Sequence, residues 1–197
     1  IVGGSGKTLY NLYTVFGIEQ KSVDFVLGTA TTDVDGKINE VLRHIEDHLL
    51  GEVMTGAKAL VSAEFFDKLI AHPAVREAYK YYTATGAQPL REDVRRQFPH
   101  KGLIFEEYRG SGQLANGTTA RFIAAGEGHA FPLGTTNTFR TYFAPANKDE
   151  FVNTFGMEAY AWPVRTDDER GWRIIMESNP LPLCRRPQIL VKLTSSN

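Results

Sequence analysis

The clearest periodic pattern of apolar residues lies between positions 33 and 49 and predicts an amphipathic helix. Its apolar residues recur every three or four positions: Ile38, Val41, Leu42, Ile45 and Leu49. Thr32 or Asp33 supplies an N-cap for this helix, and Gly51 supplies a C-cap. The spacing places the apolar residues on one face, which we expect to be buried.

Two more helices are predicted after a short buried strand at residues 57–62. The first spans residues 63–71 and is capped by Ser62. The second begins at Pro73, because proline suits the first turn of a helix. Beyond it, residues 86–102 combine prolines with several basic residues and predict a loop around one helical turn.

Most of the remaining pattern predicts short strands separated by turns. These strands are expected at residues 9–16, 22–27, 103–108, 120–124, 139–143, 172–177 and 189–193. In the segment 172–177, Trp172, Ile174 and Met176 alternate with other residues, as in a half-buried strand. We expect the strand near the C-terminus to lie beside residues 57–62. Helices in the first half and strands at both ends indicate an α+β fold.

Composition excludes several classes of protein. The chain has 197 residues, 42% of them hydrophobic and 23% charged, which is typical of a globular protein with a buried core. Its net charge of -1 argues against nonspecific binding to nucleic acid as the main task. A single cysteine, Cys184, fits a reducing compartment. Because the chain opens at Ile1 without an initiator methionine, we expect it to be part of a longer protein.

The residue types of catalysis are present, but their spacing does not predict an active site. His44 and His48 share a helical face at a spacing that chelates zinc, yet Ile45 stands where zincins have glutamate. Glu106 and Glu107 point to opposite faces of a strand and cannot act as a pair. We therefore predict no catalytic, cofactor-binding or metal-binding residues, and no enzyme. The basic stretch 91–101 is predicted to be a solvated loop, with contact to a neighbouring subunit as the alternative.

Several segments together resemble one protein family, and they occur in the same order along the chain. The segments are Leu9–Tyr13, His44–Asp47, Phe65–Ile70, His72–Tyr79, Phe105–Gly110, Phe139–Ala146, Val152–Gly156 and Glu177–Pro187. They are similar to the major capsid proteins of lambda-like tailed phages and prophages, the phage major capsid protein E family. The resemblance covers nearly the whole chain.

The resemblance implies the α+β capsid fold of tailed phages, which has an axial domain with a central sheet and flanking helices, and a peripheral domain. The N-terminal arm, extended loop and spine helix of the family have no counterpart here, so we expect this chain to be the C-terminal part. Residues 1–31 and 141–186 would supply peripheral strands. Residues 32–140 and 187–197 would form the axial domain.

The function that the resemblance implies is that of a structural subunit of an icosahedral capsid. Copies would assemble into pentamers and hexamers around double-stranded DNA in the bacterial host cytoplasm. Scaffolding, portal and decoration proteins are possible further partners, and this chain alone is expected to be a monomer or a weak oligomer. Two alternatives are a shell of the same fold around protein cargo and a metal-dependent hydrolase using His44 and His48.

Overall fold

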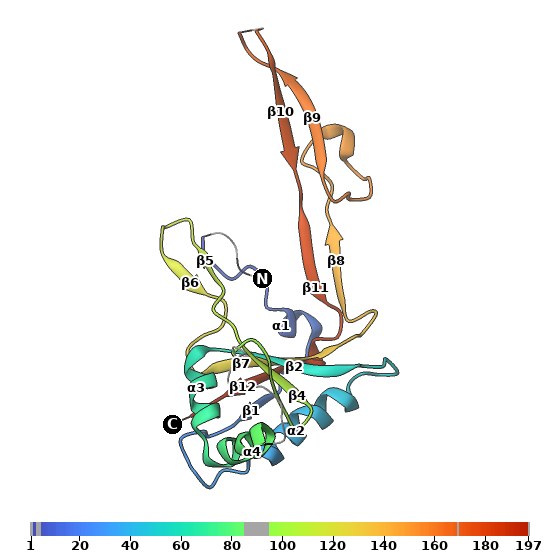
Figure 1. Cartoon of the computed structure of the whole chain (residues 1–197). Helices are drawn as coiled ribbons and strands as arrows, with labels where there is room; N and C mark the ends of the chain where they lie inside the picture. The colour runs from blue at the N-terminus through green and yellow to red at the C-terminus, as the bar shows by residue number, and fades with distance from the viewer. Residues whose placement is uncertain (1, 3–4, 85–94, 169, 197) are drawn as a thin grey trace. The chain divides into compact units, whose positions relative to one another are not determined.

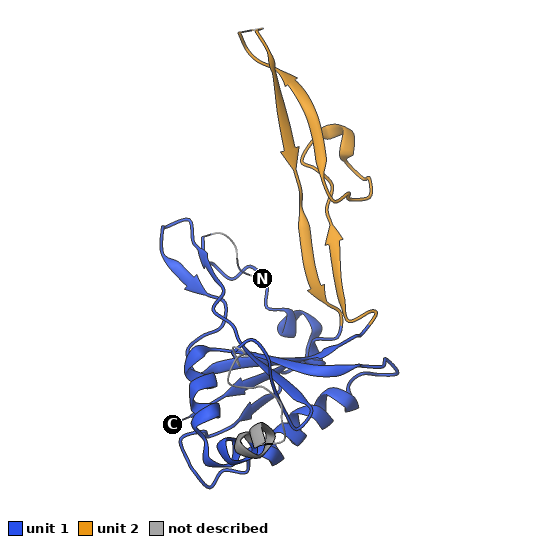
Figure 2. Cartoon of the chain, viewed as in Figure 1, with its two compact units in different colours: residues 1–135, 186–197 blue, residues 136–185 orange. Residues whose placement is uncertain are grey.

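The computed structural model describes residues 2, 5–84, 95–168 and 170–196, and the chain divides into two compact units. Unit 1 comprises residues 1–135 and 186–197, and unit 2 comprises residues 136–185 (Figure 2). Residues 86–94 of the predicted basic loop lie outside the described residues. The α+β class predicted from the sequence is confirmed, because both units contain strands and unit 1 adds three helices of nine residues or more.

Unit 1 is built on a six-stranded sheet whose strand order is β1-β12-β7-β2-β4-β3 (Figure 1). Its strands are β1 (Ser22–Asp24), β2 (Gly56–Val61), β3 (Phe98–His100), β4 (Leu103–Glu107), β7 (Glu127–Leu133) and β12 (Val191–Thr194). The β1–β12 and β2–β4 pairs are parallel, and the other pairs are antiparallel. The sheet therefore joins strands from both ends of the chain.

Unit 1 also contains three longer helices: α2 (Val34–Asp47), α3 (Ala63–Ala71) and α4 (Pro73–Ala84). The predicted N-caps are confirmed at α2 and α3, but the predicted C-cap Gly51 is wrong, because α2 ends at Asp47 with His48 as its C-cap. The Asp33 carboxylate accepts a hydrogen bond from the Gly36 N–H at 2.9 Å, and the Ser62 hydroxyl accepts one from the Phe65 N–H at 3.2 Å. Each cap satisfies a backbone donor that the first helical turn leaves without an intrahelical acceptor.

Only one set of alternate strand residues joins the hydrophobic core. This pattern indicates that all three helices pack against the same face of the sheet. Ala59, Ala130 and Val191 are paired across three neighbouring strands and all lie in this core. The opposite face carries charged side chains. There Lys58 Nζ lies 2.5 Å from Glu106 Oε2, and Lys192 Nζ lies 2.6 Å from Glu127 Oε1. Leu60, Ile104 and Phe131 also lie on this opposite face, so it mixes charged and apolar side chains.

The strand predicted at residues 9–16 is wrong, because Leu12–Phe16 forms the short helix α1. The Asn11 side chain accepts a hydrogen bond from the Tyr13 N–H at 3.1 Å and caps the start of this helix. Gly17, with φ of 65°, ends the helix in the left-handed conformation. These two local signals outweigh the strand preference of the aromatic and β-branched residues between them.

The C-terminal strand is confirmed, but its expected neighbour is wrong. Pro187–Ile189 forms the 3₁₀ turn η2, and the strand β12 begins after it. It pairs with β1 and β7 and does not contact residues 57–62 through backbone pairing. The strand β7, which the sequence pattern did not predict, lies between β12 and β2.

Unit 2 contains two antiparallel ribbons of two strands each. One pairs β8 (Phe139–Phe143) with β11 (Pro180–Cys184), and the other pairs β9 (Tyr160–Arg165) with β10 (Trp172–Glu177). The 3₁₀ turn η1 (Asp149–Phe151) lies in the connection between β8 and β9. A separate small hairpin in unit 1 pairs β5 (Ser111–Gln113) with β6 (Thr119–Arg121), so the strand predicted at residues 120–124 begins and ends earlier.

The expected domain division stays a prediction, and the compact units group residues 1–31 differently. The strand β1 belongs to the sheet of unit 1, whereas the expected division groups residues 1–31 with residues 141–186. Parallel pairing with β12 holds β1 in that sheet, and the Phe25 N–H donates to the Thr194 carbonyl oxygen at 2.8 Å. The correspondence of the two units to axial and peripheral domains stays a prediction.

We predict that Leu193→Ala lowers the free energy of unfolding of unit 1 by about 2–5 kcal/mol, because Leu193 of β12 is fully buried in the hydrophobic core. Chemical denaturation followed by far-ultraviolet circular dichroism measures this change. The matched control is Leu9→Ala, since Leu9 is exposed and should change stability by less than about 0.5 kcal/mol. Equal stability of the two variants would show that β12 is not part of the core.

Candidate functional surfaces

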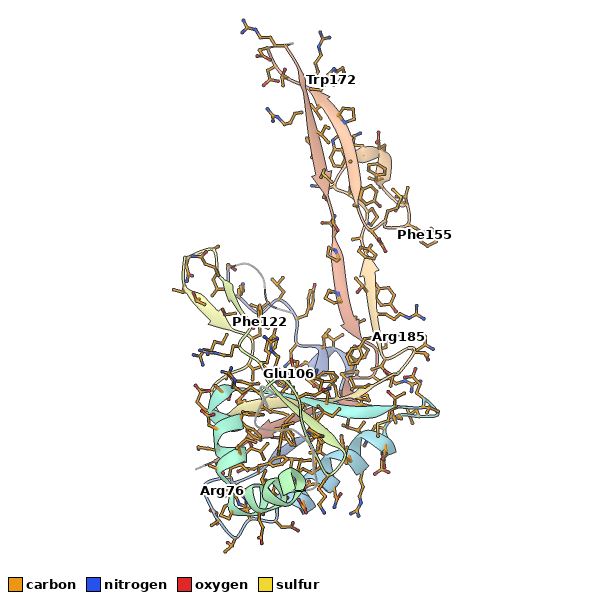
Figure 3. The ribbon with its side chains drawn as sticks, viewed as in Figure 1. Arg76, Glu106, Phe122, Phe155, Trp172 and Arg185 are labelled. Carbon is orange, nitrogen blue, oxygen red and sulfur yellow. The ribbon has the colours of Figure 1, made fainter. Side chains whose placement is uncertain are left out.

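One face of the β9–β10 ribbon is apolar and open to solvent. Trp172, Ile174 and Met176 alternate along β10 and are 68%, 70% and 73% exposed. Figure 3 labels Trp172 on this strand. Residues paired across an antiparallel ribbon share a face, so this face also carries Ala161 and Pro163 of β9, with the charged Arg165 beside Trp172 at its end. We call this face, defined by Trp172, Ile174 and Met176, the bare face. The alternation predicted a strand correctly, but the expected half-burial of these residues is wrong.

The opposite face of the same ribbon is covered by the connection between β8 and β9. The Phe151 ring of η1 lies 4.7 Å from the Tyr160 ring and 6.3 Å from the Trp162 ring, measured between centroids. Lys148 Nζ lies 5.4 Å from the centroid of the Trp162 ring. The Tyr160 hydroxyl accepts a hydrogen bond from the Met157 N–H at 2.9 Å. Phe151, Tyr160 and Trp162 therefore pack together on one side of the ribbon.

A second feature is a pocket of about 240 Å³ in unit 1, at the carboxyl end of β4. It is lined by Arg95, Arg96, Glu106, Glu107 and Arg109, so the fold brings part of the predicted basic stretch next to the two glutamates. The two glutamates point to opposite faces, as expected. Glu106 pairs with Lys58, while Glu107 lies 4.0 Å from Arg109 Nε. We call this feature the arginine pocket.

The two histidines at the end of α2 lie together, and each ring contacts a backbone carbonyl oxygen. Their ring centroids are 4.2 Å apart. His44 Nε2 lies 3.0 Å from the Gln188 carbonyl oxygen, and His48 Nδ1 lies 2.8 Å from the His44 carbonyl oxygen. Burial and the neighbouring His48 lower the pKa of His44, against the opposing effect of the Gln188 carbonyl. Among the described residues no group of three or more metal-ligating side chains occurs, and the absence of bound metal stays a prediction.

Asp168 and Cys184 of unit 2 also lie in local structures. Asp168 lies in the turn between β9 and β10, where its carboxylate accepts a hydrogen bond from the Arg170 N–H at 3.2 Å. Hydrogen bonds to Thr166 and Arg170 lower the pKa of Asp168. Cys184 is a buried thiol at the end of β11. No helix in the described part of the chain is long and apolar enough to cross a membrane.

Comparison with known proteins identifies the family to which the chain belongs. A solved structure described as the assigned capsid protein of a prophage of E. coli CFT073 has a TM-score of 0.50 and 15% sequence identity. The similarity covers 81% of this chain and 47% of that chain, and it shows a capsid-protein fold. Residues 1–195 match the phage major capsid protein E family, and the chain therefore belongs to that family. The resemblance drawn from the sequence segments is confirmed.

Two relatives carry the name major capsid protein. The protein of Pseudomonas phage KPP10 is 39% identical over 198 residues, which cover 95% of this chain and 56% of that protein. The protein of Salmonella phage Felix O1 is 30% identical over 218 residues, covering 97% of this chain and 59% of that protein. The chain therefore spans little more than half the length of these relatives.

We predict that the two faces of the β9–β10 ribbon differ in their contribution to the stability of unit 2. Tyr160→Ala should cost about 3 kcal/mol, because it removes a buried ring from the covered face. Ile174→Thr on the bare face should change stability by less than about 0.5 kcal/mol.

Tryptophan fluorescence during denaturation measures the two effects in unit 2 directly. Both tryptophans of the chain, Trp162 and Trp172, lie on this ribbon, so selective excitation of tryptophan reports the unfolding of unit 2. A large loss of stability in Ile174→Thr would contradict the exposure of the bare face.

A pH effect is predicted at His129 on the charged face of the sheet. Burial lowers the pKa of His129 and Lys192 adds to this, while Glu127 opposes it. The unfolded chain therefore takes up the proton more readily, and the stability should fall as the pH drops below about 6.5. Thermal unfolding at pH 7 and pH 5 should show a smaller difference for His129→Gln than for the parent. The exposed Leu9→Ala variant should keep the parent difference.

Proposed function

We propose that the protein containing this chain is a structural subunit of an icosahedral phage or prophage capsid, located in the virion. Its copies assemble into pentamers and hexamers and enclose double-stranded DNA, and assembly takes place in the bacterial host cytoplasm. The observation that carries the proposal is the family match over residues 1–195. The names of the two phage relatives support the same role.

Exposed apolar side chains in both units support a protein that works through contacts with other chains. Beyond the bare face, Phe155 of unit 2 is 98% exposed (Figure 3). In unit 1, Leu9, Tyr10 and Val15 are also mostly exposed. Soluble monomers rarely expose large contiguous apolar patches, and interfaces between subunits are the usual reason for them. Closed shells consist of many copies, so every subunit needs matching surfaces of this kind.

The two units have distinct proposed places in such a subunit. Unit 1, with its sheet and helices, corresponds to the axial domain, and unit 2 supplies strands of the peripheral domain. The capsomer contacts around five-fold and six-fold axes are heterologous, so two different patches of each subunit must fit each other. Scaffolding, portal and decoration proteins are further partners of the complete subunit.

Electron microscopy of the full-length protein tests the proposed function. The protein, produced in bacteria and purified, should form closed shells in negative stain, and shells from infected or induced cells should contain nuclease-protected DNA. Shells filled with protein and free of DNA would contradict the enclosure of DNA. A folded full-length protein that never forms shells would contradict the capsid role itself.

We also predict that residues 1–197 alone form a monomer or a weak oligomer at micromolar concentration. A stable interface generally buries about 1,200 Å² or more, and the contacts of one subunit in a ring are designed to act together with many others. Light scattering coupled to size exclusion measures the mass. Particles of megadalton mass formed by this chain alone would contradict the prediction, while a concentration-dependent shift toward dimers would agree with it.

A further inference from the structure

The arginine pocket has an excess of positive charge. Glu106 already has a cation at 2.5 Å in Lys58, and Glu107 lies beside Arg109. The Glu107 side chain is only 7% exposed, so its charge is turned away from solvent, whereas Arg109 is 71% exposed. Arg95 and Arg96 add two more guanidinium groups to the lining. The described lining therefore holds three guanidinium groups and two carboxylates, and one of these carboxylates is paired with Lys58.

Arg96 is the guanidinium with the clearest capacity for a further ligand. It is exposed, and within the described part of the chain it forms no ion pair. A guanidinium presents several N–H donors in a plane that matches the two oxygens of a carboxylate or the oxygens of a phosphate. The pocket is therefore suited to an anionic group.

The form of the pocket favours a carboxylate side chain over the backbone of DNA. Proteins that bind the DNA backbone present an extended basic surface, because phosphates repeat along the duplex. This pocket is small and concave, and two glutamates form part of its lining. A single carboxylate can reach Arg96 without an extended contact. The net charge of -1 of the whole chain points the same way.

We propose that the arginine pocket binds a carboxylate side chain of a second copy of this chain, and this inference rests on the proposed capsid function. The chain offers exposed carboxylates without an ion pair in the described residues, among them Asp67 of α3 and Glu77 of α4. They lie on helices, whereas the pocket lies at the end of β4. Two different patches of opposite charge are what a heterologous contact between identical subunits requires.

Charge reversal in the full-length protein tests the contribution of the pocket to assembly. Arg96→Glu should raise the protein concentration needed for shell formation about tenfold or more, because a close charge pair across an interface becomes a repulsive one. The matched control is Arg43→Glu, an exposed arginine of α2 outside the pocket, which should assemble as the parent does. Circular dichroism verifies that both variants are folded. Assembly of Arg96→Glu at the parent concentration would overturn the inference and leave the capsid function intact.

Carbodiimide crosslinking identifies the partner of the pocket. Shells are prepared from the Arg96→Lys variant as an equal mixture of unlabelled and heavy-isotope-labelled protein, and a carbodiimide then joins the new amine to a carboxylate in direct contact. Mass spectrometry should find a crosslink between a labelled and an unlabelled peptide, with the acidic residue on the second copy. Arg43→Lys shells serve as the control for random crosslinking.

Other results of the charge-reversal and crosslinking experiments would overturn the inference. Crosslinks confined to one copy, such as those to Glu106 or Glu107, would show that the pocket only satisfies its own carboxylates. Arg96→Glu shells that form normally but lose nuclease-protected DNA would assign the pocket to nucleic acid. If the parent protein itself forms no shells, the proposed function fails first, and that result is distinct from a failure of the variant alone.

Discussion

The pairing of the C-terminal strand β12 with β1 and β7 is the interaction on which unit 1 depends. Residues 191–194 lie between a strand from the first 25 residues and a strand from the middle of the chain. Without β12, β1 would have no partner in the sheet and the core would lose Val191 and Leu193. This pairing joins residues about 170 positions apart, so it depends on the fold of the whole unit and on no local signal.

The apolar and charged faces of the sheet follow from this arrangement. All three long helices lie on one face, so alternate residues of the central strands are buried, while the residues between them form a face with ion pairs as well as apolar side chains. Ion pairs such as Lys58–Glu106 link neighbouring strands on the open face. In this pair, Lys58 balances the charge of Glu106, which is one of the two carboxylates that line the arginine pocket. The pairing of strands in the sheet therefore affects the charge of the proposed contact between copies.

Unit 2 is organised by a different constraint, because a two-stranded ribbon has no interior of its own. Phe151, Tyr160 and Trp162 cover one face of the β9–β10 ribbon, and the other face keeps its apolar side chains in solvent. The aromatic cluster therefore packs against the ribbon from one side only.

The sequence by itself determined the features that depend on neighbouring residues. The period of Ile38, Val41 and Ile45 predicted α2, and Ser62 and Pro73 marked the starts of α3 and α4, because helix spacing and capping act within a few residues. The ordered segments from Leu9–Tyr13 to Glu177–Pro187 also indicated the family correctly.

Tertiary structure alone decided which strands are neighbours and which alternating faces are covered. The pattern at Trp172, Ile174 and Met176 is the same for a buried and an exposed face, since alternation records only that side chains point in two directions. The approach of Arg96 to Arg109 likewise depends on the pairing of β3 with β4 and on the turn that follows β4. Such contacts between distant residues arise from the packing of whole elements, and local patterns do not encode them.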